Sequence, residues 1–146
     1  MGELGFRVPT DTDVSMAKAL LSAAGLPIED VTIERLALVA ERNSDVVGLI
    51  GLEQCKTLGL LRSLLVLPEN RGSGVGKALV AAIEKMAIDK GISELWLLTI
   101  DADAWFAQLG YRVEERELAP LAIQKTEEFA SLCPGDAVLM RKDLRD

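Results

Sequence analysis

The sequence of 146 residues contains no histidine. This absence excludes a Ser-His-Asp or Cys-His catalytic site and any zinc site with a histidine ligand. Acid–base chemistry must therefore come from Glu, Asp, Lys, Tyr, Cys, a ligand or water. Cysteine is also scarce, since Cys55 and Cys133 are far apart and form no CxxC pair. We interpret them as free thiols in a reducing compartment.

The chain also lacks long apolar runs and a surplus of positive charge. No run approaches the roughly 20 residues of a membrane span, and residues 1–10 show no secretory signal pattern. The formal net charge is −7, which argues against binding to nucleic acid or to an anionic membrane surface. We expect a soluble, cytoplasmic protein with no nucleic-acid or membrane partner.

What is present is a large apolar fraction in a regular order. Apolar residues make up 49% of the chain, enough for the core of one domain over residues 1–146. Extended runs bounded by turn residues and segments of helical spacing predict the elements. We expect strands at residues 4–8, 36–41, 46–55, 60–67, 92–100, 112–118 and 137–141, and helices at 14–24, at 28–35, from the glycine-rich loop to Gly91, and at 120–132. We also expect a short helix through Leu109 that Asp101 or Asp103 caps.

The connections between these elements predict the fold class. Short turns at residues 43–45 and 56–59 join three strands, which is typical of an antiparallel meander. Strand, helix and strand then follow in that order, which predicts a parallel pair joined by a right-handed crossover. The prediction is an α/β protein with a mixed sheet of about seven strands flanked by helices.

The loop RGSGVG at residues 71–76 is the most informative segment. Its glycines, Gly72, Gly74 and Gly76, allow tight turns and close approach of a ligand. The helix that follows presents unpaired N–H groups and a partial positive charge, which suits a phosphate. Arg71 and Lys77 add charge if they point inward. The loop fits neither the P-loop nor the dinucleotide pattern, and the alternative is a turn that only joins a strand to a helix.

The loop in its context resembles the GNAT acetyltransferase superfamily. Residues 71–76 match the motif R/Q-x-x-G-x-G/A, after a strand ending LLVLP and before an amphipathic helix. The resemblance implies the GNAT fold, with a bulge near the end of that strand that opens a slot for coenzyme A. It also implies acetyl-CoA as co-substrate and no metal. The cofactor residues implied are Leu64, Leu65 and Val66 on the strand, and Arg71, Gly72, Ser73, Gly74, Val75, Gly76 and Lys77 in the loop and helix.

A narrower resemblance concerns residues 95–144. This stretch is similar to a GNAT subgroup encoded with arsenic-resistance genes and to the acetyltransferase domain of N-acetylglutamate synthases. Both are linked to amino-acid-like acceptors. The resemblance therefore implies an N-acetyltransferase that transfers acetyl directly to the primary amine of a small amino-acid-like acceptor. Two alternatives remain open, a protein or peptide amine acetyltransferase and a non-catalytic acyl-CoA-binding module, and we allow for a homodimer.

The catalytic groups of the family are only partly matched. Aligning WFAQLGY with the family's FYxxxGF block puts Phe106 where many members have a tyrosine, so a dedicated general acid is missing. We interpret Tyr111 as core packing and Phe106 as core or pocket wall. The strand glutamate that serves some members as base corresponds to about Leu60. Glu53 on the neighbouring strand is the candidate base, and an exposed strand-end carboxylate or a water relay are its alternatives.

Arg62, Thr99 and Phe106 are the candidate acceptor-binding residues, and Thr99 is also a candidate catalytic residue together with Glu53. Arg62 interrupts an apolar strand, where a charge is costly unless it is paired. Its guanidinium could hold a carboxylate of the acceptor, or form an internal ion pair. Thr99 ends the strand LWLLT, where its hydroxyl could bond the acceptor or the thioester, and simple strand propensity is its alternative.

Overall fold

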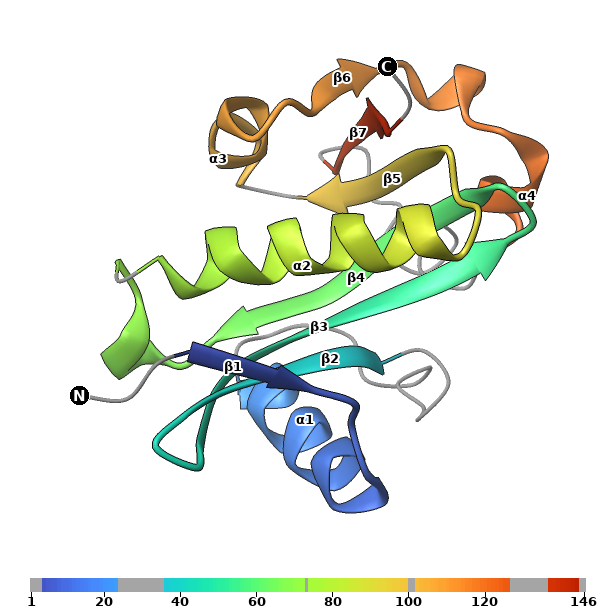
Figure 1. Ribbon diagram of the computed structural model, residues 1–146. Coiled ribbons are helices and arrows are strands. Elements are labelled where there is room, and N and C mark those ends of the chain that lie inside the picture. The colour runs from blue at the N-terminus through green and yellow to red at the C-terminus, as the bar shows by residue number, and fades with distance from the viewer. Residues whose placement is uncertain (1–3, 24–35, 73, 100–101, 127–136, 145–146) are drawn as a thin grey trace. The chain divides into compact units, whose positions relative to one another are not determined.

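The computed structural model describes residues 4–23, 36–72, 74–99, 102–126 and 137–144. Its strands form a mixed seven-stranded sheet in the order β1-β2-β3-β4-β5-β7-β6 (Figure 1). This confirms the predicted fold class. The strands are β1 Leu4–Arg7, β2 Leu36–Arg42, β3 Asp45–Cys55, β4 Leu58–Val66, β5 Glu94–Thr99, β6 Arg112–Glu114 and β7 Val138–Asp143, and the helices are α1 Asp11–Ala23, η1 Pro68–Asn70, α2 Val75–Asp89, α3 Asp103–Gln108, η2 Arg116–Leu118 and α4 Leu121–Gln124.

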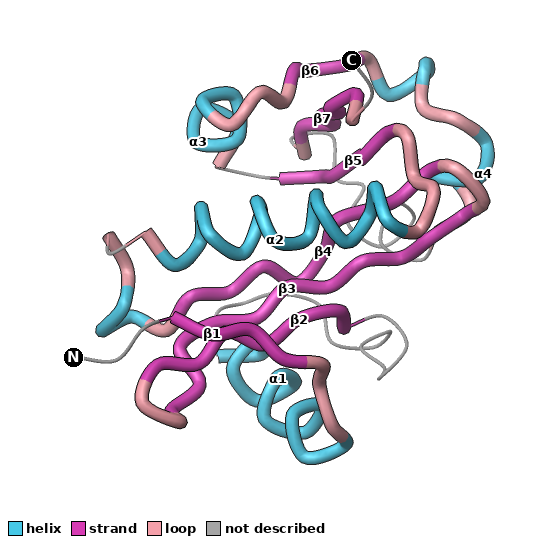
Figure 2. The backbone as a smooth tube through the Cα atoms, viewed as in Figure 1, coloured by secondary structure: helices cyan, strands magenta, loops and turns pink. Residues whose placement is uncertain are grey.

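The predicted meander of three strands is confirmed: β2 pairs antiparallel with β3, β4 lies next to β3 in the sheet, and short turns join them (Figure 2). Asn43 and Ser44 connect β2 to β3 with φ angles of 55° and 69°, the positive pair that a type I′ hairpin requires. The next turn is shorter than we expected. Lys56 and Thr57 suffice for the connection, and β4 begins at Leu58, because a two-residue loop already matches the twist of the strands.

The predicted parallel pair is also confirmed. β4 and β5 run parallel, with Leu58–Leu60 of β4 beside Glu94–Trp96 of β5. Helix α2 connects them in the sequence and ends before Gly91, whose φ of +82° is the left-handed conformation of a helix stop. β7 then pairs antiparallel with both β5 and β6.

The chain divides into two compact units, each with its own apolar cluster. Unit 1 comprises Met1–Leu52 and Ser63–Lys85, and unit 2 comprises Glu53–Arg62 and Met86–Asp146. That both form one domain over residues 1–146 stays a prediction. The cluster of unit 1 contains Ala17, Leu21, Leu36, Leu49 and Leu65, and that of unit 2 contains Leu60, Trp96, Ala119, Ile123 and Leu139.

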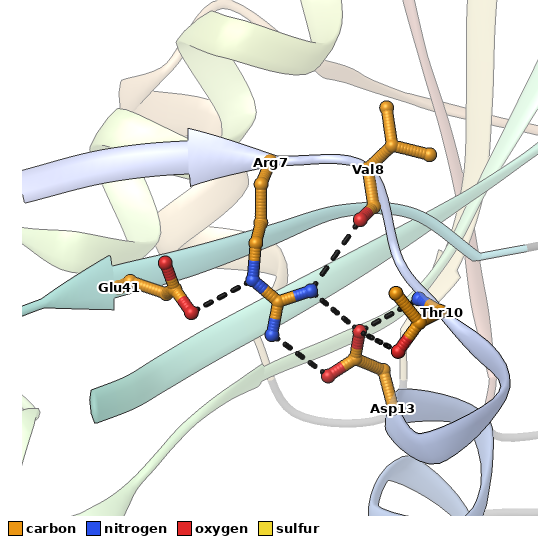
Figure 3. A network of polar contacts seen from close by, with 5 residues as sticks. All are labelled: Arg7, Val8, Thr10, Asp13 and Glu41. Carbon is orange, nitrogen blue, oxygen red and sulfur yellow. Dashed lines mark hydrogen bonds and ion pairs between the residues drawn. The ribbon is translucent and has the colours of Figure 1, made fainter. Parts of the chain in front are cut away.

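Unit 1 also contains a polar network that the sequence did not predict (Figure 3). Arg7 on β1 holds the buried carboxylate of Asp13 through Nη1 at 2.6 Å and Nη2 at 2.9 Å, and its Nε donates to Glu41 on β2 at 2.7 Å. The amide and hydroxyl of Thr10 also donate to Asp13. The hydrogen bonds from the Arg7 guanidinium, and secondarily those from Thr10, stabilise the charged carboxylate and hold the pKa of Asp13 far below its ordinary value. One guanidinium therefore joins β1, α1 and β2.

Several predicted element boundaries were wrong. α1 begins three residues earlier than expected, because the amide of Val14 already donates to the carbonyl of Thr10. Asp103 does not cap α3, since it is the first residue of the helix and the N-cap is Ala102, whose amide donates to Thr99 Oγ1; Asp101 lies outside the described residues. β6 stops at Glu114, and the following residues form the turn η2 instead of a longer strand.

The C-terminal helix is also shorter than predicted. α4 begins after Pro120 as expected but ends at Gln124, and Thr126 Oγ1 donates to the carbonyl of Ile123 at this end. Residues 127–132 of the predicted helix lie outside the described residues, as does the helical turn predicted at 28–35. Within the described residues, no helix is both long and apolar enough to cross a membrane.

Candidate functional site

The glycine-rich loop leaves β4 through a sharp turn. The amide of Leu67 donates to the carbonyl of Val47, and the amide of Asn70 donates back to Leu67, which closes the short helix η1. Gly72 and Gly74 follow with φ angles of +79° and +87°, a conformation that only glycine adopts without strain. A Cβ at either glycine would meet no atom within 4 Å. The space beside the loop is therefore open. Glycine is required at positions 72 and 74 because of their positive φ angles, and not because a side chain would lack room.

Helix α2 begins directly after this loop. The amide of Ala78 donates to the carbonyl of Gly74 at 3.0 Å, so the amides of Val75, Gly76 and Lys77 precede the helical ladder. The buried side chain of Val75 anchors the turn, whereas Lys77 is exposed. The first turn of α2 carries no acidic side chain that would compete for these amides. Geometry and charge together suit an anion.

Arg71 lies back against the strand. Its side chain is exposed, and its Nε donates to the carbonyl of Val66 at 3.1 Å. The guanidinium thus ties the start of the loop to the end of β4. Of the remaining predicted cofactor residues, Leu65 is buried and Leu64 and Val66 are half-buried, while Ser73 lies outside the described residues.

β4 contains an irregularity and is closely packed near its end. Ser63 has a φ of +58° inside the strand, as expected where a bulge interrupts a ladder.

Gly48 of β3 lies against the end of β4 and the start of α2. A Cβ on Gly48 would lie 2.9 Å from the carbonyl oxygen of Leu65, 3.0 Å from Cδ1 of Leu79 and 3.2 Å from Cγ1 of Val75. Gly48 therefore allows β3, β4 and α2 to approach closely, and we overlooked it although a glycine inside a strand is a signal for such an approach.

Arg62 and Glu53, both in unit 2, form an ion pair. Nη1 of Arg62 donates to Oε1 of Glu53 at 3.2 Å. The side chain of Arg62 is only 2% exposed, whereas that of Glu53 is 18% exposed. The structure thus brings together the candidate base and the candidate carboxylate-binding residue, and the internal ion pair that we considered for Arg62 is present.

Thr99 and Phe106, also in unit 2, take part in local structure. Thr99 Oγ1 accepts the amide hydrogen of Ala102 at 3.0 Å, which leaves its own O–H able to donate. Phe106 is buried on α3 and makes edge-to-face contacts with Trp105 and Tyr111, at centroid distances of 4.8 Å and 5.6 Å. Tyr111 is buried too, which agrees with its interpretation as core packing.

Cys55 lies two residues after Glu53 and is a half-buried free thiol. Burial, and secondarily the charge of Glu53, raises the pKa of this thiol. It is therefore protonated at neutral pH and a poor nucleophile. Cys133 lies outside the described residues. Cys55 is therefore poorly suited to form a covalent acyl-enzyme intermediate.

Comparison with known proteins agrees with this geometry. The family model of the acetyltransferase (GNAT) domain matches residues 34–113. An uncharacterized N-acetyltransferase of Chlorobaculum tepidum is 32% identical over 111 residues, which cover 73% of this chain and 69% of that protein.

Solved structures share the fold at lower sequence identity. N-acetylglutamate synthase from Neisseria gonorrhoeae, complexed with coenzyme A and N-acetyl-glutamate, matches with a TM-score of 0.84 and 22% identity; the match covers all of this chain but only 36% of that one. A GNAT-family acetyltransferase from Staphylococcus aureus matches with a TM-score of 0.79 and 16% identity, covering 98% of this chain and 100% of the other. With the family model and the related N-acetyltransferase in agreement, the chain belongs to the GNAT family of acetyltransferases.

Proposed function

We propose that this protein transfers the acetyl group of acetyl-CoA directly to the primary amine of a small, amino-acid-like acceptor. The observation that carries the proposal is the buried guanidinium of Arg62, paired with a half-buried Glu53 in an acetyltransferase fold. A buried arginine can hold a carboxylate with charge-assisted bonds. Its neighbour can accept the proton that an ammonium group must lose before it attacks.

The cofactor would bind at the glycine-rich loop. The open space beside Gly72 and Gly74 and the amides of Val75, Gly76 and Lys77 fit the diphosphate of coenzyme A. Leu64, Leu65 and Val66 would offer backbone groups to the pantetheine arm. In this role Arg71 keeps the loop against Val66, and Lys77 adds positive charge at the entrance. These residues would bind and orient the thioester.

The acceptor would bind at residues of unit 2. Arg62 would hold its carboxylate, Thr99 would donate its remaining hydroxyl hydrogen, and Phe106 would contribute to the apolar wall. The resemblance to the arsenic-resistance subgroup and to N-acetylglutamate synthase supports this acceptor class, since the Neisseria synthase is complexed with N-acetyl-glutamate. An acceptor with both an amine and a carboxylate satisfies Arg62 and Glu53 together.

In the proposed reaction, the amine of the acceptor loses two protons and gains the acetyl group. Glu53 takes one proton from the ammonium of the acceptor, and the neutral amine attacks the thioester carbonyl. The C–N bond forms and the C–S bond breaks, and the nitrogen loses its second proton as the CoA thiolate gains one. Phe106 has no hydroxyl to supply that proton, so we assign its delivery to water. The products are the N-acetylated acceptor and coenzyme A.

The test is a panel of amines with acetyl-CoA and a thiol reagent that reports free coenzyme A. The panel contains the proteinogenic amino acids, matching amines that lack the carboxylate, and a basic peptide. We expect turnover with one or more amino acids. Turnover of the peptide alone would instead identify a protein acetyltransferase. Calorimetric binding of coenzyme A without turnover of any amine would identify a non-catalytic binding module.

A further inference from the structure

Strand β6 is an end strand of the sheet and lies next to β7 (Figure 1). Its outer edge has no partner among the described strands. An edge strand presents unpaired N–H and C=O groups, and a further strand can add to it through main-chain hydrogen bonds. Another chain can therefore extend the sheet at β6, and the side chains of β6 decide which chain fits.

One face of β6 carries an apolar row that stops at this edge. The register places Met140 of β7 between Leu97 of β5 and Val113 of β6, so these three side chains share one face. Leu97 and Met140 are 1% and 0% exposed, whereas Val113 is 62% exposed. Leu118 and Leu121, which follow β6 in the sequence, are exposed too. The buried row therefore lacks a covering residue on the outer side of Val113.

The other face of β6 carries two opposite charges. Arg112 and Glu114 are two residues apart, so they share this face, and Nε of Arg112 lies 3.1 Å from Oε2 of Glu114. The same carboxylate oxygen lies 2.7 Å from Nε of Arg141 on β7. The side chain of Arg112 is 57% exposed. A row of alternating charges thus reaches the edge of the sheet and ends there with an exposed cation.

The sequence Arg112-Val113-Glu114 is self-complementary in an antiparallel pair. About a twofold axis at Val113, each Val113 lies opposite the partner's Val113, and each Arg112 lies opposite the partner's Glu114. A parallel pair in the same register would instead place like charges opposite each other, which is unfavourable. The formal charge of −7 on each chain opposes association, so the attraction has to come from the complementary edge itself.

We propose that the outer edge of β6 binds β6 of a second copy of this chain, antiparallel and centred on Val113, and so forms a twofold-symmetric dimer. The sheets of the two copies would join at this edge. Each Val113 would be covered by its own copy, and each Arg112 would gain a second carboxylate. This dimer does not depend on the acetyl acceptor, so its test is separate from that of the proposed function.

The direct test is a cross-link at the twofold axis. Opposite residues in antiparallel strands have Cα atoms about 4.5–5.5 Å apart, which is within the roughly 4.4–6.8 Å that a disulfide spans. Val113→Cys should therefore give a disulfide-linked dimer under mild oxidation, seen by non-reducing electrophoresis. Val8→Cys is the matched control, because Val8 is 71% exposed but lies outside β6. Both variants keep Cys55 and Cys133, so a cross-link through a native thiol would appear in both.

Sedimentation equilibrium tests the arrangement of charges without a cross-link. The wild type should sediment as a dimer of 15.8 kDa chains. Arg112→Glu puts like charges opposite each other at both ends of the strand pair and should raise the dimer dissociation constant roughly tenfold or more. Adding Glu114→Arg to this variant restores opposite charges and should return the constant toward the wild-type value. Val8→Lys should leave it unchanged.

The outcomes either support this dimer or overturn it. A wild type that stays monomeric up to roughly 0.1 mM overturns the proposal. A dimer in which Val113→Cys cross-links no more than Val8→Cys, or which Arg112→Glu leaves intact, uses another surface and overturns it too. A loss that Glu114→Arg does not reverse overturns the antiparallel register. Thermal unfolding reports whether each variant folds, and Val113→Lys, with two ammonium groups at the axis, replaces Arg112→Glu if that variant does not.

Discussion

Substitution of Gly48 by alanine should disturb the two elements that flank the glycine-rich loop, the end of β4 and the start of α2, without changing the loop itself. The added methyl group would lie 2.9 Å from the Leu65 carbonyl oxygen, closer than real Cβ atoms approach. A backbone oxygen inside a strand cannot rotate away as a flexible side chain can. The methyl groups of Leu79 and Val75, at 3.0 Å and 3.2 Å, close the other directions. The end of β4 or the first turn of α2 must therefore shift.

The expected magnitude follows from these contacts. Overpacking of a tight core site costs about 1–3 kcal/mol, and the lower chain entropy of alanine returns about 0.4–1 kcal/mol. The net loss in free energy of unfolding is therefore at most about 2.6 kcal/mol, with a central value of about 1.3 kcal/mol, and the central value corresponds to a fall in Tm of roughly 3–5 °C for a chain of this length. A shift of a few tenths of an ångström at α2 should also raise the Kd for coenzyme A by roughly threefold or more.

The assay is thermal unfolding with calorimetric titration of coenzyme A. Gly5→Ala is the matched control, because Gly5 also lies in a strand of unit 1 and a Cβ there meets nothing within 4 Å. The control should be neutral or slightly stabilising and should bind coenzyme A normally. If Gly48→Ala were as stable as Gly5→Ala and bound coenzyme A equally well, the close approach inferred for Gly48 would be refuted.

Two further predictions concern unit 1. Gly74→Glu should raise the Kd for coenzyme A at least about a hundredfold, because the new side chain puts negative charge where the phosphates should lie. The φ of +87° at residue 74 also strains any residue other than glycine. An unchanged Kd by calorimetry would contradict the anion site. Asp13 has a lowered pKa in the folded protein, so its contribution to stability is complete above about pH 5 and is lost as the pH falls through and below about 4. Asp13→Asn should cost about 2 kcal/mol at neutral pH and flatten the acid side of a plot of stability against pH, which chemical denaturation at several pH values would detect.

The elements of the fold followed from local signals in the sequence. Alternating apolar runs, Asn43 and Ser44 at a turn, and Gly91 after a helix act over a few residues, so they predicted the meander and the crossover correctly. Boundaries were wrong where the exact hydrogen-bonding pattern of a few neighbouring residues decided them. At the start of α3, the amide of the N-cap residue Ala102 donates to the hydroxyl of Thr99, three residues earlier, and residue types alone did not predict this bond.

In the candidate site, too, the sequence predicted some features, and others became known only from the tertiary structure. The glycine-rich loop is a local backbone pattern, and the sequence by itself determined where it lies and that a helix follows it. Only the tertiary structure decided that Arg62 pairs with Glu53, that Arg7 pairs with Asp13, and that Gly48 lies against the end of β4 and the first turns of α2. A charged side chain in a sequence rich in acidic residues has many potential partners, and strand register and hairpin geometry select among them by bringing one within bonding distance.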